Sequence, residues 1–386
     1  MARPKGSKNK KEIKETKEPD FTETEKVDDI ETPEVEETKQ EVSFDDIPVI
    51  KKDKEDVESK KELASFLKEC NKIFDEGSIC LANEVVDMEK LSTRILLLDI
   101  LTKGGIPRSQ IVLFYGDESS GKTAALLRFA SVFTKQKIPV LLIDAEHAFD
   151  KVWTEKLGND LDYFHVAQPD SLEKGINLAE SAIASKQFGL VIYDSITAAV
   201  PREVLDKDAF QQQMGIQARA NAKLMAKVTS RLQPANLKDP ESYNKTIFAM
   251  VAHVREKIGV MYGNPETIPG GRAIRHHASY IFKLRKGAII EKDKKPIGRE
   301  TRIKVEKAKF SPPLVQGVVQ FFFDPPRYNN AETLIVYGAQ LGFIKQAGAY
   351  YSYGDIKAQG KKGILAELKK HPDKLKELKE NIMASF

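Results

Sequence analysis

The sequence has few of the residues that build disulfide frameworks or metal centres. Its 386 residues include two cysteines, Cys70 and Cys80, and six histidines. Neither cysteine has a second cysteine or a histidine at the spacing of a zinc site. A small secreted fold held by disulfides therefore has little support, and two reduced thiols are the simpler interpretation.

Long apolar runs and a strong charge of one sign are also missing. No apolar segment approaches the roughly 20 residues that span a bilayer, and the basic start of the chain has no apolar segment behind it, unlike a secretory signal. We therefore expect a cytoplasmic protein that is neither secreted nor inserted in a membrane. The formal net charge of +4 is too small to indicate a polyanionic partner, so any basic surface must be local.

The first 58 residues lack hydrophobic periodicity, and their charges are separated by sign. Residues 1–17 carry seven basic and two acidic side chains, whereas residues 18–46 carry thirteen acidic and two basic ones. This composition predicts a disordered charged tail over residues 1–58. Its start, around Arg3 and Pro4, loosely resembles AT-hook peptides that bind the minor groove, although a solvated tail is the more common identity of such a run.

The rest of the chain divides into three parts. Residues 59–92 open with a helical pattern whose apolar stripe needs a surface to cover it. Residues 93–325 alternate apolar β-runs with helix-like segments, which predicts an α/β core with a mostly parallel sheet flanked by helices and with an antiparallel edge. Residues 326–386 are Lys-rich with shorter elements and predict a small C-terminal domain. The stripe consists of Leu63, Phe66, Leu67, Cys70 and Ile73, and the expected strands are 112–115, 140–143, 190–193, 247–252, 280–284, 301–305 and 318–323.

A loop bracketed by two glycines carries the strongest functional signal. It lies between an apolar β-run and a segment of helical composition, which is the context that a phosphate-binding loop requires. Backbone N–H groups of such a loop face the phosphates, Lys122 reaches the β- and γ-oxygens, and the Thr123 hydroxyl ligates Mg²⁺. An ordinary glycine turn is the alternative that this context disfavours. The loop comprises Gly116, Asp117, Glu118, Ser119, Ser120, Gly121, Lys122 and Thr123.

Two further strands end in carboxylates. Asp194 follows the run 190–193, at the edge where ligands of open α/β sheets collect, and is a candidate for the second magnesium-side group; a helix-capping aspartate is the alternative. The run 139–143 ends in Asp144, with Glu146 and His147 close behind. Glu146 is the candidate base that deprotonates the attacking water. Spacing alone does not separate it from Asp144, for which a structural role is the simpler interpretation.

A long segment without periodicity spans residues 255–271. It contains four glycines, two prolines, the cations Arg255 and Lys257 and the aromatic Tyr262, and Arg272 and Arg275 follow it. Long structureless loops in compact domains are usually functional. Cations, flexible backbone and an aromatic ring suit single-stranded nucleic acid, whereas a surface loop without function is the alternative.

Four segments together resemble the bacterial RecA recombinase family. They are the loop 116–123, Ile-Asp-Ala-Glu-His-Ala-Phe-Asp at 143–150, Lys-Ile-Gly-Val-Met-Tyr-Gly-Asn-Pro-Glu-Thr at 257–267 and Gly-Ala-Tyr-Tyr-Ser-Tyr at 348–353. The resemblance runs from about residue 59 to the C-terminus and implies a RecA-type ATPase core that uses ATP and Mg²⁺. It also implies a homo-oligomeric helical filament on single-stranded DNA, which pairs with homologous duplex DNA and exchanges strands while DNA stimulates ATP hydrolysis.

The resemblance implies roles for individual residues. Glu146 matches the general base, Asp194 the magnesium-side acid and Trp153 the aromatic that stacks on adenine, a role that suits an indole face. Lys307 and Lys309 match the pair that reaches the ATP of the neighbouring protomer, and the stripe in 59–92 matches a helix that docks on the adjacent subunit. The matching DNA-binding positions are Met214, Gly215, Arg219, Arg255, Lys257, Ile258, Gly259, Tyr262, Gly270, Gly271 and Arg272.

The chain also departs from the family pattern. His253 stands where the family has a glutamine that senses the γ-phosphate, and His276 stands where it has an aromatic that couples subunits. The family's acidic C-terminal tail is missing, and the acidic segment 18–46 is hypothesised to screen the DNA loops from duplex instead. The unusual tail and the altered sensor would fit a phage-encoded member.

Two other classes share the phosphate loop. A ring-forming helicase or related motor would lack the 257–267 block. A non-catalytic scaffold that uses ATP only as a switch would need neither the base nor the cation pair. Turnover with and without single-stranded DNA, together with the shape of the assemblies, separates the three.

Overall fold

The computed structural model describes residues 55–74, 77, 79–202, 215–234, 236–256 and 266–385. The chain divides into two compact units, residues 1–60 and 61–386. Within the first unit, the structure describes only the start of helix α1 (Glu55–Phe74). Leu63, Phe66 and Ile73 of α1 are more than half exposed. The apolar stripe expected from the sequence is therefore largely uncovered in the isolated chain.

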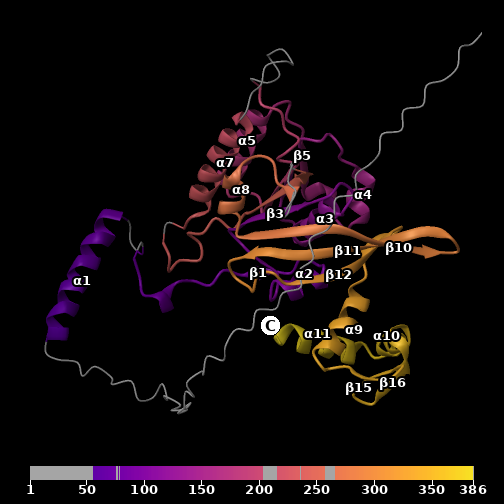
Figure 1. Cartoon of the computed structure of the whole chain (residues 1–386). Helices are drawn as coiled ribbons and strands as arrows, with labels where there is room; N and C mark the ends of the chain where they lie inside the picture. The colour runs from indigo at the N-terminus through magenta and orange to yellow at the C-terminus, as the bar shows by residue number, and fades with distance from the viewer. Residues whose placement is uncertain are drawn as a thin grey trace, which may run out of the picture. The chain divides into compact units, whose positions relative to one another are not determined.

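The second unit is built on a nine-stranded sheet (Figure 1). Its order is β13-β12-β11-β10-β3-β7-β6-β4-β5, and the pairs from β10 to β5 are parallel. The other three pairs, from β10 to β13, are antiparallel. The predicted α/β class, with a mostly parallel sheet and an antiparallel edge, is confirmed. The bounds are β3 (Ile111–Gly116), β4 (Val140–Asp144), β5 (Phe164–Ala167), β6 (Leu190–Asp194), β7 (Ile247–His253), β10 (Tyr280–Lys292), β11 (Lys295–Ala308), β12 (Gln316–Phe323) and β13 (Pro326–Tyr328).

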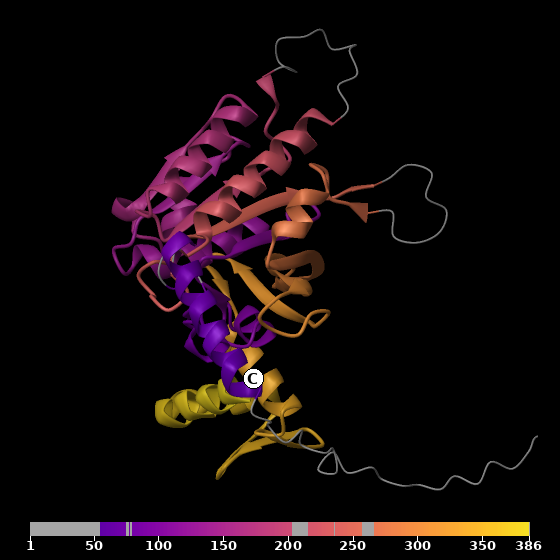
Figure 2. The ribbon, with the colours of Figure 1, turned by 90° about the vertical axis from the view of Figure 1, so that its left-hand side faces the viewer.

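Both faces of the sheet are covered, which explains the continuous apolar runs of its central strands. In β3, Val112 and Phe114 join a core that includes α3 (Lys122–Thr134). Leu113 and Tyr115 join the core on the other face, which includes α5 (Leu172–Ala184) and α7 (Ile216–Leu232). Figures 1 and 2 show α5 and α7 side by side on one face.

The C-terminal residues form a small α/β unit, as predicted. A three-stranded antiparallel sheet, β14 (Lys345–Ala347), β15 (Tyr350–Tyr353) and β16 (Ile356–Gln359), packs with α9 (Asn330–Gln340), α10 (Gly360–Lys370) and α11 (Pro372–Ala384). Leu96 and Ile100 of α2 (Leu96–Leu101) share this core. The small unit is thereby fixed to the core of the nine-stranded sheet through α2.

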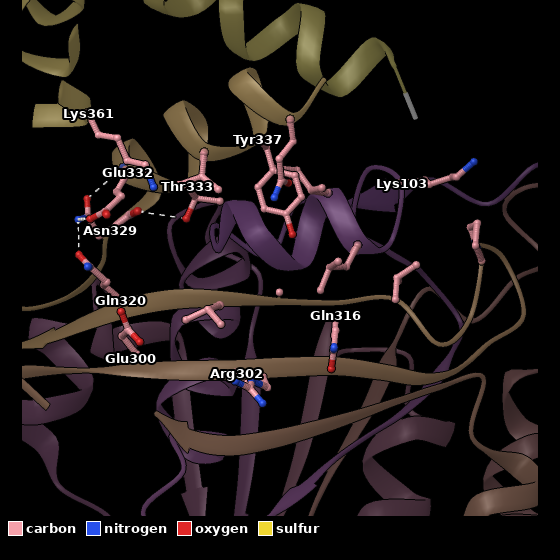
Figure 3. A pocket seen from close by; sticks show the side chains of 18 residues that line it. Lys103, Glu300, Arg302, Gln316, Gln320, Asn329, Glu332, Thr333, Tyr337 and Lys361 are labelled. Atoms are coloured by element: carbon pink, nitrogen blue, oxygen red, sulfur yellow. Dashed lines mark hydrogen bonds between the residues drawn. The ribbon is translucent and has the colours of Figure 1, made fainter. Parts of the chain in front are cut away.

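A cavity of about 830 Å³ lies between α9 and the outer strands β11 and β12 (Figure 3). Its polar side chains partly satisfy each other, because the Asn329 amide donates to Gln320 Oε1 at 2.9 Å and to Glu332 Oε2 at 3.1 Å. The glycine-bracketed loop 116–123 does not line this cavity. Within the described part of the chain, none of the helices has the length and apolar content needed to cross a membrane.

Candidate functional site

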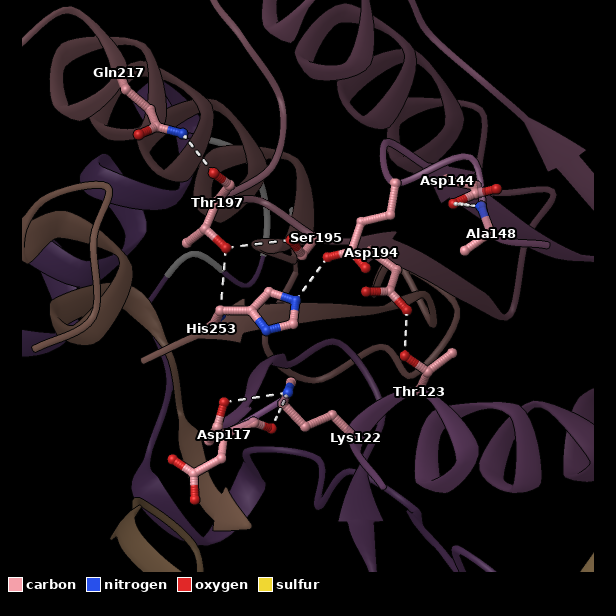
Figure 4. Close-up of polar contacts among 12 residues, drawn as sticks. Asp117, Lys122, Thr123, Asp144, Ala148, Asp194, Ser195, Thr197, Gln217 and His253 are labelled. Atoms are coloured by element: carbon pink, nitrogen blue, oxygen red, sulfur yellow. Dashed lines mark hydrogen bonds and ion pairs between the residues drawn. The ribbon is translucent and has the colours of Figure 1, made fainter. Parts of the chain in front are cut away.

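The glycine-bracketed loop joins β3 to α3 at the carboxyl edge of the parallel strands. A Cβ on Gly116 would lie 2.0 Å from the Leu284 carbonyl oxygen of β10, so only glycine fits there. Gly121 caps α3 with a φ of 90°, in the left-handed region that favours glycine. Lys122 Nζ donates to the carbonyl oxygens of Gly116 and Asp117 at 3.1 and 2.7 Å (Figure 4). Burial lowers the pKa of Lys122, although surrounding carboxylates oppose this effect.

Asp194 lies beside this loop at the end of β6. The Thr123 hydroxyl donates to Asp194 Oδ2 at 2.6 Å, and the carboxyl is buried. Burial raises the pKa of Asp194 to about 6, and the nearby Glu146 charge adds to this, whereas the Thr123 bond opposes it. Among the described residues, Asp194 Oδ1 and Ser120 Oγ are buried without a hydrogen-bond partner. These orphaned oxygens and the Thr123 hydroxyl fit a magnesium ion and a phosphate chain, which would supply the missing partners.

The raised pKa leads to a stability prediction for Asp194→Asn. The folded state binds the Asp194 proton more tightly than the unfolded state. The buried carboxyl therefore does not destabilise the folded state below about pH 4, and its destabilising effect is complete above its folded pKa. One pKa unit corresponds to about 1.4 kcal/mol, so the substitution should raise the free energy of unfolding by about 2–3 kcal/mol at pH 7.5. The gain should be smaller by about 1 kcal/mol at pH 5. Urea unfolding in EDTA without nucleotide measures both values, and a gain that does not grow with pH would contradict the assignment.

Asp144 and Glu146, which spacing could not separate, have different surroundings. Asp144 is buried and accepts hydrogen bonds from the N–H groups of Ala148 and Phe149 and from the Gln168 amide, at 3.2, 3.0 and 2.9 Å. Its oxygens hold the following turn in place. Glu146 has a side chain that is 31% exposed, and its Oε1 lies 2.7 Å from His253 Nε2. Glu146 is therefore the carboxylate that is open to a water molecule.

His253 is fixed by residues that the sequence did not single out. Its backbone N–H donates to Thr197 Oγ1 at 3.2 Å. The Gln217 side-chain amide, from α7, holds the turn that contains Thr197. It donates hydrogen bonds to the carbonyl oxygens of Ile196 and Thr197 at 3.3 and 3.4 Å (Figure 4). A chain of hydrogen bonds thus links the start of α7 to the Glu146–His253 pair. Neither Thr197 nor Gln217 belongs to a pattern that identifies it.

His147 and Trp153 lie on the connection after β4. His147 is exposed and adopts a φ of 55°. Trp153, in α4 (Lys151–Lys156), is half-buried, and its ring meets Phe321 of β12 edge-on at a centroid distance of 6.2 Å. The indole also packs against the core beside α3, and adenine stacking by Trp153 stays a prediction.

Lys307 and Lys309 lie away from the loop of their own chain, toward the amino-terminal edge of the parallel strands. Lys307 pairs with Ile281, which pairs with Leu113, three residues before Gly116. With a rise of about 3.3 Å per residue and two strand spacings of about 4.8 Å, this places Lys307 roughly 10 Å below the loop and 10 Å to its side. The Lys309 N–H donates to Ser279 O, and the Ser279 N–H donates to Ile111 O at the start of β3. Neither lysine can reach its own phosphate loop.

The surroundings of these lysines are cationic. Lys307 Nζ donates to the carbonyl oxygens of Arg275 and His276 at the end of α8 (Arg272–His277), at 2.8 Å each. Burial, and then the charges of Lys309 and Arg275, lower the pKa of Lys307. His276 is exposed. The arrangement suits an anion presented from outside the chain.

The described DNA-binding candidates lie around the adjoining helices α7 and α8. Gly215 caps α7 with a φ of 89°, and Gly270 and Gly271 precede α8 with φ values of 97° and 95°. The Asn221 amide of α7 donates to Gly270 O at 3.1 Å, so the two helix starts are held together. Arg219 and Arg272 are exposed.

Arg255 begins β8 (Arg255–Glu256), which pairs with β9 (Glu266–Thr267). Met214, Lys257, Ile258, Gly259 and Tyr262 lie outside the described residues.

Comparison with known proteins accounts for most of the chain. The family model of the RecA N-terminal domain matches residues 61–325, and that of the RecA C-terminal domain matches residues 332–386. Curated proteins named Protein RecA are similar to it. Those of Lactobacillus johnsonii and Dichelobacter nodosus are 34% identical over 333 and 334 residues, which cover 85% of this chain and 90% and 93% of theirs. That of Streptococcus pneumoniae is 36% identical over 338 residues, which cover 85% and 84%.

Proposed function

The chain belongs to the RecA family, and from this premise we propose that it is a DNA-dependent ATPase that forms helical filaments on single-stranded DNA. It pairs this DNA with a homologous duplex and exchanges strands in the cytoplasm. The observation that carries the proposal is the separation of two half-sites within one chain. The loop with Glu146 lies at one edge of the sheet, and Lys307 and Lys309 lie toward the other. Head-to-tail stacking of protomers would bring them together.

Each half-site has a distinct chemical task in this proposal. The loop amides and Lys122 hold the triphosphate, and Thr123 and Asp194 hold Mg²⁺, which when bound neutralises charge on the β- and γ-phosphates. Glu146 accepts a proton from the attacking water, because of the two carboxylates after β4 it is the exposed one. Lys307 and Lys309 of the next protomer offset the charge that develops on the γ-phosphate, as an arginine finger does in trans.

The DNA contacts are proposed for the described residues around α7 and α8 and for the loops beyond them. Arg219 and Arg272 are exposed cations on adjoining helices, which suits a phosphate backbone. Gln217 of α7 is hydrogen-bonded to the turn that positions His253. DNA that orders the start of α7 would therefore influence the Glu146–His253 pair, which gives DNA-stimulated turnover a physical route.

One pair of measurements separates this proposal from the other classes. ATP hydrolysis is measured with and without single-stranded DNA, and the complexes are imaged by electron microscopy. We expect DNA-stimulated hydrolysis on open helical filaments. Closed rings would instead support a helicase, and filaments without turnover would support a scaffold.

A further inference from the structure

A second cavity, of about 670 Å³, lies between the ATPase core and the C-terminal unit. Its volume falls within the range of small-ligand pockets. Leu96, Leu334 and Leu375 supply apolar wall. Arg94, before α2, and Arg128, in α3, contribute cations from the core, and α11 contributes Lys376 and Lys379. The cavity is therefore strongly cationic, although the chain as a whole is almost neutral.

The core cations of this cavity have no carboxylate partner. Arg128 Nη1 donates to Leu157 O at 3.0 Å, but Arg128 Nε is buried without a hydrogen-bond partner in the described structure. Neither Arg94 nor Arg128 forms an ion pair with any described carboxylate, and the same holds for neighbouring Lys135. Burial, and then the charge of Arg94, lowers the pKa of Arg128. Burial, then Arg94 and Arg128, lowers the pKa of Lys135.

Arg128 and Lys135 lie close together. A Cβ on Gly158 would lie 3.2 Å from Arg128 Nη1 and 3.6 Å from Lys135 Nζ, so both side chains reach the same point. A cluster of like charges with a buried, unpaired guanidinium N–H destabilises the chain unless an anion compensates it.

The one acidic side chain of the cavity lining is already engaged. Asp99 accepts hydrogen bonds from the Ser92 hydroxyl at 2.5 Å and from the Thr93 N–H and hydroxyl at 2.7 Å each. On the α11 side, Lys376 lies 3.8 Å from Glu380, whereas Lys379 has no ion pair within the described chain, although burial raises the pKa of Asp99 and the charge of Lys379 acts on that carboxyl to lower it. Arg94, Arg128 and Lys379 are thus the cations left for a ligand.

We propose that this cavity binds an anion of the phosphate or diphosphate class, at a site separate from the phosphate loop. Guanidinium groups present several N–H donors in a fixed fork that matches phosphate oxygens. The bound anion would supply the partner that Arg128 Nε lacks and would offset the mutual repulsion of Arg94 and Arg128. Because Lys379 belongs to the C-terminal unit, the anion would also tie that unit to the core.

Calorimetric titration of the full-length protein with pyrophosphate tests the proposal. The Lys122→Ala background and EDTA weaken binding at the phosphate loop. We expect a saturable site, and Arg94→Ala or Arg128→Gln should each weaken it by about tenfold, the loss of one charge-assisted hydrogen bond. Lys379→Ala, at an exposed position, tests the site without disturbing the core. Lys369→Ala, an exposed lysine of α10 outside the cavity, is the matched control and should leave the affinity unchanged.

Two results would overturn the proposal. One is the absence of saturable binding up to about 10 mM pyrophosphate, an affinity too weak to matter. The other is binding that Arg94→Ala, Arg128→Gln and Lys379→Ala all leave unchanged. A competition arm identifies the source of the phosphate. Displacement of pyrophosphate by ADP would assign the site to a nucleotide, and its absence would assign it to a free anion, so both outcomes support the site.

Discussion

Glu146→Gln is expected to lower kcat for DNA-stimulated ATP hydrolysis by about 10²–10⁴-fold, the usual contribution of a general base. An amide cannot accept the proton of the attacking water. The substitution keeps the length of the side chain and its contact with His253, which lies 2.7 Å away, so ATP binding and filament assembly should survive. Steady-state turnover with single-stranded DNA, paired with nucleotide binding, measures both properties.

Two matched variants sharpen this test. Glu155→Gln changes an exposed carboxylate of α4 and should leave turnover unchanged. Asp144→Asn removes the charge that holds the turn after β4 through three hydrogen bonds, so it should lower thermal stability. Loss of a general base should lower kcat by at least about 10²-fold. If Glu146→Gln retained more than about a tenth of wild-type kcat, Glu146 would therefore not be the base.

Lys307→Ala combined with Lys309→Ala is expected to lower kcat by about 10³-fold, the lower end of the range for cations supplied in trans. Each protomer should still bind ATP, because neither lysine lies near its own phosphate loop. Turnover on single-stranded DNA and nucleotide binding by the free protein separate the two effects.

Lys307 also has a structural contact that must be controlled. Its Nζ donates to two carbonyl oxygens at the end of α8, so Lys307→Ala should also lower thermal stability. Lys309 has no side-chain hydrogen bond within the described chain, and Lys309→Ala alone should reduce turnover without unfolding the protein. Lys292→Ala, on the exposed part of the β10–β11 hairpin, should change neither property. Full turnover of the double variant would remove the cation pair from the mechanism.

The sequence predicts the central fold well because the parallel strands are buried on both faces. The run 190–193 is apolar throughout and ends in Asp194, and the run 140–143 behaves in the same way before Asp144. Strand β5 was missed because it is a short edge strand in which His165 and Val166 are exposed. The outer halves of β10 and β11 were missed for a related reason, since residues 285–292 carry mostly exposed side chains.

The candidate site likewise has parts that the sequence predicts and parts that only the structure shows. Residues in local patterns, such as the loop 116–123, can be placed from sequence. The separation of Asp144 from Glu146 needs the hydrogen bonds of Ala148 and Phe149. Gln217 and Thr197 support His253 from distant parts of the chain. Arg94 and Arg128 line the same cavity although they stand 34 residues apart in the sequence. Such juxtapositions depend on tertiary packing, which local periodicity does not encode.

The central claim is that ATP lies between protomers, and mixing two inactive variants tests it most directly. Glu146→Gln protein keeps the lysine pair, and Lys307→Ala/Lys309→Ala protein keeps the base. In a random equal mixture on single-stranded DNA, about a quarter of the head-to-tail interfaces combine an intact base with an intact pair. We predict that turnover recovers to about a quarter of the wild-type rate, given independent interfaces. Turnover no higher than the mean of the two separate variants would contradict a shared site.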